Sequence, residues 1–390
     1  MSFKIIGTGM AHPALAVTNS DLSKYVDTSD EWISSRTGIK SRFISTGESM
    51  LDLSVSAAKT AVCNSGLDAG DLDLIICTTM QGDYVTPSLA CLIQRELGAA
   101  CPAFDINAAC SGFIFALDVA AAYFDAGRAE NILIVSVEMM SKYLDWNDRA
   151  TCVLFGDGAG AAVLAKGAGL RAIKITAKGD DELLFIPGNT GYSPFAGKEH
   201  KEQYVHMTGS EVFKFAVSAM IRDITDVLAA AGIGTDKVKK VIPHQANLRI
   251  IRSAAEKLNL RDDQLVLGID RYGNTSSASI PILLSELFET ATEGATELRD
   301  YFILLLTALE LLQNFENLSL TRIFIEVKLI LLQGYAPSLS NCYSCNRPMT
   351  LPMKSDWYFD PEDGGLRCDQ CSHTKSAIAI NSSTLTFWNS

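Results

Sequence analysis

The sequence predicts an α/β protein over its first three quarters, followed by a helical segment and a four-cysteine metal site. Short apolar runs alternate with alanine-rich helical patterns up to about residue 295, as in proteins whose buried sheet is covered by helices. After Glu297 the chain becomes leucine-rich with helical apolar spacing, and two pairs of cysteines follow. We therefore expect a domain boundary near Gly294, in an acidic joint.

The apolar patterns predict the elements of the first part in turn. Buried strands are expected over residues 72–80 and 130–140, and two strands joined by a glycine turn over residues 151–165. Helices are expected over residues 52–66, 86–97 and 209–233. Thr86 is the expected N-cap of the second helix, with Pro87 in its first turn. Residues 239–247 predict a strand that ends in a polar loop.

Beyond the boundary, the apolar spacing predicts two further helices. They are expected over residues 298–315 and 320–333, with Gly334 as a C-cap. Almost no turn residues interrupt either run. This texture differs from that of the first part and supports a separate structural unit.

The composition is that of an ordinary globular protein. Of the 390 residues, 48% are hydrophobic and 20% are charged, and the net charge of −12 argues against a general binder of polyanions. The first residues have the pattern of a strand and a turn rather than of a signal peptide, and the apolar runs are too short to span a bilayer. Most of the ten cysteines are scattered through apolar segments, so we expect a reducing, cytoplasmic compartment.

Cys110 is the candidate nucleophile. The stretch "FDINAACSGF" places it after a short strand and at the start of an apolar helical run. The free N–H groups and the positive dipole end of a helix favour a thiolate there. An isolated cysteine is more often a small buried hydrophobic residue, but the strand–Cys–Ser-Gly–helix context favours the nucleophile.

A cysteine nucleophile needs a base or an ion-pair partner, and His244 is the best placed of the five histidines. It follows an apolar run, at the carboxyl end of a predicted strand, where active sites of α/β proteins form. The other four histidines lie in polar or terminal contexts, where a solvated side chain is the ordinary interpretation. Asn274 lies in a loop that opens a helix, and taken alone it would be a cap or turn residue.

Five motifs in order carry a family resemblance over about residues 1–290: "EWISSRTGI", "DINAACSGF", "FGDGAGAAVL", "PHQAN" and "RYGNTSSASIP". They resemble the thiolase-fold condensing enzymes, most closely the β-ketoacyl-acyl-carrier-protein synthase III family. The resemblance implies a duplicated α/β/α/β/α domain that acts as a homodimer, with halves over residues 1–166 and 167–295. It also implies Cys110, His244 and Asn274 as a catalytic triad that needs no metal or redox cofactor.

The resemblance implies a reaction and a coenzyme A entrance as well. Cys110 would take an acyl group from acyl-coenzyme A, and decarboxylation of malonyl-acyl-carrier-protein would give an enolate stabilised by N–H donors of His244 and Asn274. A 3-oxoacyl product would follow and would initiate fatty acid synthesis. Thr86 would line the primer pocket. The entrance would be formed by Trp32, Arg36, Thr37, Arg149, Phe213, Asn247 and Arg249; the ordinary alternative for each arginine is a surface ion pair, and for Trp32 a core or rim aromatic.

The chain departs from that family after the helix that begins near Ser279. In the family a glycine-rich strand and a final strand complete the second sheet there and supply an N–H group to the oxyanion hole. Neither is present in this sequence. The resemblance therefore implies a thiolase-like domain that lacks its last two strands.

Residues 297–388 have a resemblance of their own. The stretches "FIEVKLILLQGYAPSLSNCYSCNRP" and "FDPEDGGLRCDQC" are similar to the C-terminal region of the RecO recombination-mediator family, so residues 296–390 form the third expected domain. Two CxxC pairs at this separation predict a structural zinc site in the form of a zinc ribbon, with the ligands Cys342, Cys345, Cys368 and Cys371. The region is mildly acidic and lacks the basic face that DNA binding requires.

Three functional hypotheses remain open at this level. The first is a condensing enzyme with a structural zinc appendage. The second is a truncated fusion that keeps the motifs but has little activity. The third is an accessory module of DNA recombination or repair that acts through its zinc-binding end.

Overall fold

The computed structural model describes residues 2–188, 195, 203–290, 338–349, 356–360, 365–371 and 378–380. The chain divides into two compact units, Met1–Glu289 and Thr290–Ser390, and each is described by itself. The helices predicted over residues 298–315 and 320–333, and the C-cap predicted at Gly334, lie outside the described residues. None of the described helices combines the length and the hydropathy that crossing a bilayer requires.

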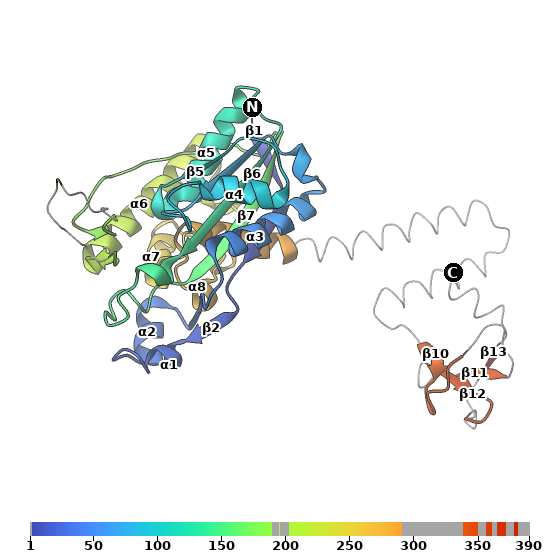
Figure 1. The fold of residues 1–390 in the computed structure, drawn as a ribbon. Coiled ribbons are helices and arrows are strands. Elements are labelled where there is room, and N and C mark those ends of the chain that lie inside the picture. Colours follow the sequence, from blue (N-terminus) through green and yellow to red (C-terminus); the bar gives the residue numbers. More distant parts are fainter. Residues whose placement is uncertain are drawn as a thin grey trace. The chain divides into compact units, whose positions relative to one another are not determined.

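A five-stranded mixed sheet forms the centre of the first unit (Figure 1). Its strands lie in the order β1 (Ser2–Ala11), β7 (Asp157–Gly167), β6 (Asn131–Met139), β4 (Leu74–Thr78) and β5 (Ala103–Ile106). Strand β7 runs antiparallel to β1 and to β6, whereas β4 runs parallel to β6 and to β5. The buried strands predicted over residues 72–80 and 130–140 are β4 and β6.

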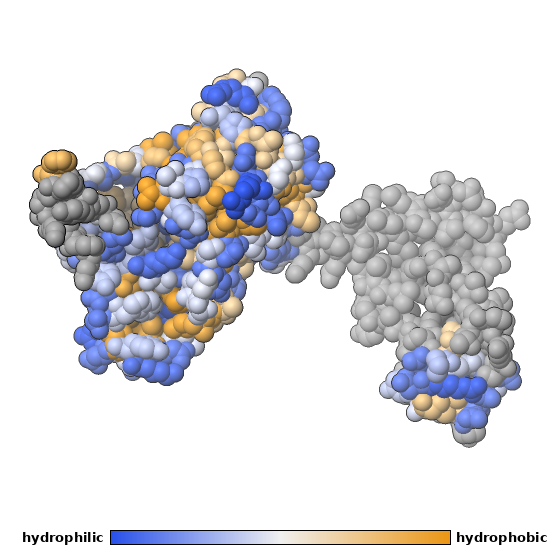
Figure 2. Space-filling model, viewed as in Figure 1, coloured by the Kyte–Doolittle hydropathy of each residue, from blue (hydrophilic) through white to orange (hydrophobic). Residues whose placement is uncertain are grey.

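Helices cover both faces of this sheet. Ile75 and Cys77 of β4 pack with α3 (Met50–Ser65) and α4 (Leu89–Leu97), while Leu74 and Ile76 pack with α5 (Gly112–Asp125). This division follows from the pleat, because successive residues of a strand point to opposite faces. The visible surface of the unit mixes hydrophilic and hydrophobic residues (Figure 2).

The start of α4 differs from the prediction. The N-cap is Ser88, whose side chain accepts a hydrogen bond from the backbone N–H of Cys91. Thr86 lies outside the helix, because the residue before a proline is disfavoured in the helical conformation. The N-cap predicted at Thr86 is therefore wrong by two residues.

The glycines of residues 156–160 serve close packing rather than a turn between two strands. Residues 157–167 form the single strand β7, so the prediction of two strands is wrong. A Cβ atom added at Gly160 would lie 2.6 Å from the backbone nitrogen of Ile282, and one at Gly158 would lie 3.0 Å from the Ile282 side chain. The absence of side chains lets the helix over residues 279–290 pack directly on β7.

Two short strands and two short helices lie beside the central sheet. Strands β2 (Leu15–Thr18) and β3 (Ser41–Ile44) pair in antiparallel fashion, and two short helices lie near them, α1 (Asn19–Leu22) and α2 (Asp30–Thr37). Arg42 of β3 is fully buried and donates to the backbone carbonyl of Val153 at 2.7 Å. This contact fixes the loop that precedes β7.

The second half of the unit is mostly helical among the described residues. It contains α6 (Gly209–Ala231), α7 (Leu248–Lys257), α8 (Ile269–Tyr272) and the helix over residues 279–290, with the two-residue strands β8 (Leu184–Phe185) and β9 (His206–Met207). The strand predicted over residues 239–247 is reduced to one bridge, between Val241 and Leu265. A strand needs neighbours for its ladder, and the described residues supply only one side.

The second unit contains a four-stranded sheet. Its strands lie in the order β10 (Ser338–Cys342), β12 (Gly365–Cys368), β11 (Trp357–Asp360) and β13 (Ile378–Ile380). Trp357, Leu366, Cys342 and Cys368 form its small buried cluster. Cys342 and Cys368, the first cysteines of the two CxxC pairs, thus lie at the ends of β10 and β12.

Candidate active site

Cys110, His244 and Asn274 line one cavity of about 1190 Å³ in the first unit. Cys110 lies in the 3₁₀ turn η2 (Ala109–Ser111), directly before α5. His244 follows the bridge residue Val241 by three positions, and Asn274 precedes the 3₁₀ turn η6 (Ser276–Ala278). Three segments that are distant in sequence therefore bring a thiol, an imidazole and an amide to the same space.

The environment of Cys110 differs from the expectation of a helix-stabilised thiolate. Burial raises the pKa of Cys110, and hydrogen bonds from Ser276 and from the backbone only partly oppose this effect. Cys110 lies inside the 3₁₀ turn that runs directly into α5. Desolvation of the anion is the largest cause of the raised pKa of Cys110.

His244 is a neutral imidazole in this environment. Burial lowers the pKa of His244 to about 4, because the protonated ring is poorly solvated. Its Nδ1 atom is buried and has no hydrogen-bond partner among the described residues. A neutral ring retains one N–H donor and one acceptor.

Asn274 is held in a defined orientation. Its Oδ1 atom accepts a hydrogen bond of 2.9 Å from the backbone N–H of Ser276. Its own backbone N–H donates to the carbonyl of Leu154, and its carbonyl accepts from Gly156. Because Oδ1 is used, the Nδ2 donor group is the part of the side chain that remains for another partner.

Glu138 was not predicted as a site residue, although it belongs to the same region. One carboxyl oxygen lies 3.0 Å from the Ser277 hydroxyl, and the other lies 3.3 Å from the Met80 amide nitrogen. Burial raises the pKa of Glu138 to about 8, and the nearby Cys110 adds to this increase. The available signal was a single charge inside the apolar run "ILIVSVEMM".

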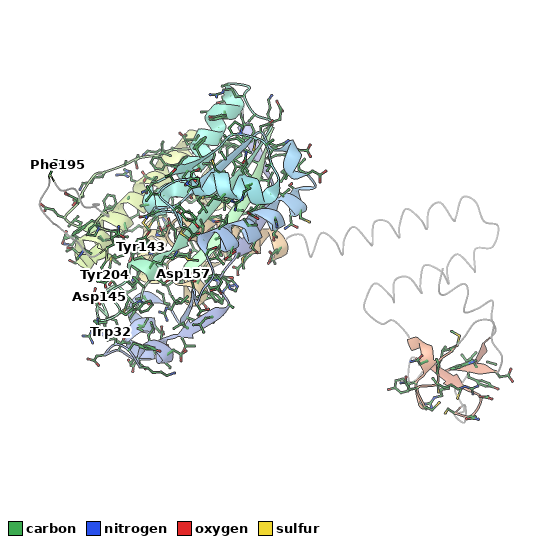
Figure 3. All side chains as sticks on the ribbon, viewed as in Figure 1. Trp32, Tyr143, Asp145, Asp157, Phe195 and Tyr204 are labelled. Atoms are coloured by element: carbon green, nitrogen blue, oxygen red, sulfur yellow. The ribbon has the colours of Figure 1, made fainter. Side chains whose placement is uncertain are left out.

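The predicted coenzyme A entrance is only partly assembled around the cavity. Trp32, Arg36, Thr37, Phe213 and Asn247 line it, whereas Arg149, Arg249 and Thr86 do not. Thr86 is exposed in the single chain. Trp32 lies on the same side of the unit as Tyr143, which also lines the cavity (Figure 3).

Two guanidinium groups lie over the Trp32 ring. The Arg36 carbon Cζ lies 4.7 Å from the centre of the Trp32 ring, and the Arg149 Cζ lies 5.1 Å from it. The Asn247 side chain donates to the carbonyl of Arg36 at 3.2 Å and so ties α7 to α2. Aromatic and guanidinium planes at a cavity mouth suit a ligand that carries a base and phosphates.

The four C-terminal cysteines form a separate cluster in the second unit. The sulfur atoms of Cys342, Cys345, Cys368 and Cys371 all lie within 4.8 Å of one another, and none forms a disulfide. The Cys345 and Cys368 sulfur atoms are 3.8 Å apart. Four thiolates at about 2.3 Å from a zinc ion give nearly this spacing, so the cluster fits a tetrahedral site with no open position.

Comparison with protein families gives matches to both units. The profile of the family described as "3-Oxoacyl-[acyl-carrier-protein (ACP)] synthase III" matches residues 104–180, and that of its C-terminal part matches residues 228–298. The profile described as "Recombination protein O C terminal" matches residues 277–387. These matches confirm both family resemblances of the sequence.

Curated relatives and solved structures agree with the first match. The chain is 45% identical to the β-ketoacyl-[acyl-carrier-protein] synthase III of Clostridium beijerinckii over 74% of its length and 91% of the relative. It is also 45% identical to the Aquifex aeolicus synthase III, whose crystal structure aligns with a TM-score of 0.70 over 74% of this chain and 92% of that one. The Thermus thermophilus structure aligns at 40% identity with a TM-score of 0.69.

Proposed function

The chain belongs to the 3-oxoacyl-[acyl-carrier-protein] synthase III family over its first three quarters, and we propose from this premise that Cys110, His244 and Asn274 are its condensing machinery. The observation that carries the proposal is that these three side chains line one cavity. The proposed activity is acyl transfer from acyl-coenzyme A, followed by decarboxylative condensation with malonyl-acyl-carrier-protein.

In the first half-reaction, Cys110 attacks the carbonyl carbon of the acyl thioester. The new bond is the enzyme thioester, and the coenzyme A thiolate leaves and takes up the proton released by the cysteine. The raised pKa of Cys110 means that the thiol, not the thiolate, predominates before substrate binds. In this proposal Trp32 and Arg36, which line the cavity, bind the nucleotide part of coenzyme A by stacking and charge.

In the second half-reaction, malonyl-acyl-carrier-protein loses carbon dioxide and leaves an enolate. The neutral imidazole of His244 and the Nδ2 group of Asn274 donate hydrogen bonds to the enolate oxygen, where negative charge develops. The carbanion then attacks the acyl carbonyl on Cys110, and the cysteine thiolate leaves as the 3-oxoacyl product forms.

Mass spectrometry after incubation with acyl-coenzyme A tests the first half-reaction. The acyl mass is expected on the peptide that contains "NAACSGF". Acylation found instead on Cys91 or Cys152 would overturn the assignment. His244→Ala and Asn274→Ala are expected to slow decarboxylation more than acylation, since both donors face the enolate; equal losses in both half-reactions would contradict their roles.

We further propose that the chain acts as a homodimer and that Thr86 contributes to the partner's primer pocket. Tyr84 and Val85, which precede Thr86, are 61% and 87% exposed, and exposed apolar residues next to one another favour an interface. Sedimentation equilibrium tests the dimer. Val85→Asp is expected to produce monomers, and a wild-type chain that sediments as a monomer would refute the proposal.

In the second unit we propose a structural zinc ion held by Cys342, Cys345, Cys368 and Cys371. The sulfur spacing fits the ion, and four thiolates leave no position for a substrate. A second candidate function for the whole chain is a fusion with weak condensing activity, which the single-bridge remnant at Val241 favours. A role in recombination through the second unit is supported by the family match alone.

A further inference from the structure

Glu138 is a buried carboxyl group beside Cys110 that the proposed condensation does not use. It is 1% exposed, and no side chain in the described part of the chain forms an ion pair with it. An acid without a cationic partner is costly to bury, and a buried acid next to a nucleophile is a common arrangement at functional sites. The groups around this carboxyl group therefore decide what it can do.

Four donor groups surround the Glu138 carboxyl group. Its Oε1 atom accepts hydrogen bonds from the hydroxyl groups of Ser277, at 3.0 Å, and of Ser276, at 3.4 Å. Its Oε2 atom accepts from the backbone N–H of Met80 at 3.3 Å and from the hydroxyl group of Thr79 at 3.5 Å. This arrangement satisfies an ionised carboxylate, which can only accept.

The same partners also satisfy the protonated acid. A hydroxyl group can turn and accept as readily as it donates, and the Ser277 hydroxyl group has a second acceptor in the carbonyl oxygen of Thr78, 3.5 Å away. When Oε1 of Glu138 carries the proton, Ser277 can donate to Thr78. The carboxyl group is then able to donate to Ser276. Either protonation state of Glu138 therefore keeps its hydrogen bonds.

Ser276 connects this carboxyl group to the nucleophile. Its hydroxyl group bonds to the Cys110 sulfur as well as to Glu138, and the bond to Cys110 stabilises the thiolate, since it lowers the pKa of the thiol. Ser276 is 1% exposed, so bulk water competes little for its hydroxyl group. A chain of thiol, hydroxyl and carboxyl groups thus runs from Cys110 to Glu138.

The backbone holds Ser276 in the position that this chain of groups requires. Ser276 has a φ angle of 51°, which is uncommon for a residue other than glycine, and its N–H donates to the Asn274 side chain at 2.9 Å. Gly112 lets the turn η6 come close, since a Cβ atom on Gly112 would lie 3.3 Å from that of Ser277. A strained backbone conformation beside the candidate nucleophile supports a functional role for the residue that adopts it.

We propose that Ser276 and Glu138 form a proton relay that activates Cys110, in which Ser276 contacts the nucleophile and Glu138 acts through Ser276. The proposal rests on the proposed acyl transfer to Cys110 and deepens it, because it gives the route of the proton that the thiol loses.

The relay balances within one acyl transfer. Before attack, the Cys110 thiol donates to the Ser276 oxygen, and the Ser276 hydroxyl group donates to ionised Glu138. Both protons then move one step, which leaves a thiolate and a carboxylic acid. The thiolate forms its bond to the acyl carbon, the bond from that carbon to the coenzyme A sulfur breaks, and the proton returns through Ser276 to the departing coenzyme A thiolate. The Cys110–Glu138 pair carries one negative charge before and after the proton moves, so two anions are never buried together.

Glu138 is the group expected to titrate near neutral pH. Burial raises the pKa of Glu138 to about 8. The titratable groups that face it are Cys77 of β4, Cys110 of η2 and Tyr143 of η3 (Met140–Tyr143), and burial raises the pKa of all three from ordinary values of 9.0 or 10.0. Gly158, its partner on β7, has no side chain. The relay is therefore competent above about pH 8 and is blocked as the pH falls below this value.

Alkylation of Cys110 by iodoacetamide tests the relay without acyl transfer. The full chain is treated over a range of pH, and mass spectrometry follows the peptide that contains "NAACSGF". We expect a step in the alkylation rate with its midpoint near pH 8. Glu138→Gln and Ser276→Ala should each abolish the step and slow alkylation above it by at least about tenfold. The double variant should be no slower than either single variant, because the two groups act in series.

Ser277→Ala is the matched control. It removes a hydrogen bond to the Glu138 oxygen atom that Ser276 also contacts, but it leaves the chain of groups to Cys110 intact. The step should remain and move to higher pH, since the bond from Ser277 lowers the pKa of Glu138. Glu130→Gln, at an exposed carboxyl group, should leave the profile unchanged. In a single turnover with acetyl-coenzyme A, Glu138→Gln should slow acetylation of Cys110 by about 10²-fold.

A wild-type profile without the step, or a step that Glu138→Gln retains, would overturn the relay. An equal loss at every pH in Glu138→Gln would also overturn it, because that result would mean that Glu138 only holds the two halves of the unit together. If Glu138→Gln does not fold, Ser276→Ala carries the test. A chain that shows the step but takes no acetyl group would refute the proposed acyl transfer alone, and acetylation that Glu138→Gln leaves unchanged would refute the relay alone.

Discussion

The carboxyl group of Glu138 lies 3.0 Å from the hydroxyl group of Ser277, although the two residues are 139 positions apart. Glu138 belongs to β6 and Ser277 to η6, the turn directly after the candidate residue Asn274. The contact therefore ties the two halves of the first unit together beside Cys110. Because burial raises the pKa of Glu138 to about 8, the carboxyl group is mostly protonated at neutral pH.

We predict that Glu138 makes stability fall as pH rises. Between about 4.5 and 8 the unfolded chain loses this proton while the folded chain keeps it, so the free energy of unfolding decreases through that window. Glu138→Gln should remove most of this decrease. Urea unfolding at pH 5 and at pH 8 measures it, with the exposed Glu130→Gln as the control. A variant that keeps the wild-type dependence would show that Glu138 is ionised in the folded chain.

His244 should act in the opposite direction. Its pKa is lowered to about 4, so between about 4 and 6.5 the unfolded chain binds a proton that the folded chain does not. Stability is therefore complete above pH 6.5 and is lost as pH falls toward 4, by about 2–3 kcal/mol. His244→Gln should remove this loss, and the exposed His206→Gln should not.

The same shift predicts the pH dependence of decarboxylation. If the neutral imidazole is the donor, the rate should not follow a histidine titration between pH 5 and pH 8. Stopped-flow release of carbon dioxide from malonyl-acyl-carrier-protein measures this rate. A rate that falls as the pH rises through about 6.5 in the wild type, but not in His244→Gln, would contradict the neutral donor.

The sequence was sufficient for the elements whose pattern is local. Strands β4 and β6 and helices α3 and α6 follow from apolar periodicity. The synthase family is identified from five motifs in order, and the RecO resemblance from two stretches that contain the cysteine pairs. The strand predicted over residues 239–247 is reduced to one bridge at Val241, since a ladder depends on neighbours that the local pattern does not contain. Glu138 was missed for a similar reason, because its role depends on Ser276 and Ser277, which approach it only in the folded unit.

Metal removal should affect the second unit alone. The purified chain is expected to contain about one zinc ion, because its four thiolates match a closed tetrahedral site. Cys368→Ser should release the ion and unfold the small sheet around Trp357, which packs with Cys368. Elemental analysis and amide hydrogen exchange measure both effects. Cys63→Ser, at an exposed cysteine outside the cluster, is the control, and a metal-free chain with an intact second unit would refute the site.

The last prediction concerns the end of the first unit. Replacing the residues after Gly294 with two strands around a glycine-rich turn would supply the ending that the family resemblance implies and that this sequence lacks. We expect condensation to rise by a factor of about 10²–10³, the usual effect of one oxyanion-hole donor, because the completed sheet restores a backbone N–H group facing Cys110. A helix-forming segment of equal length is the matched control, since it covers apolar surface without supplying ladder bonds. If the natural chain already turns over as fast as its Aquifex aeolicus relative, the truncation inferred from the sequence would be wrong, and some part of residues 297–390 must take the place of the missing strand.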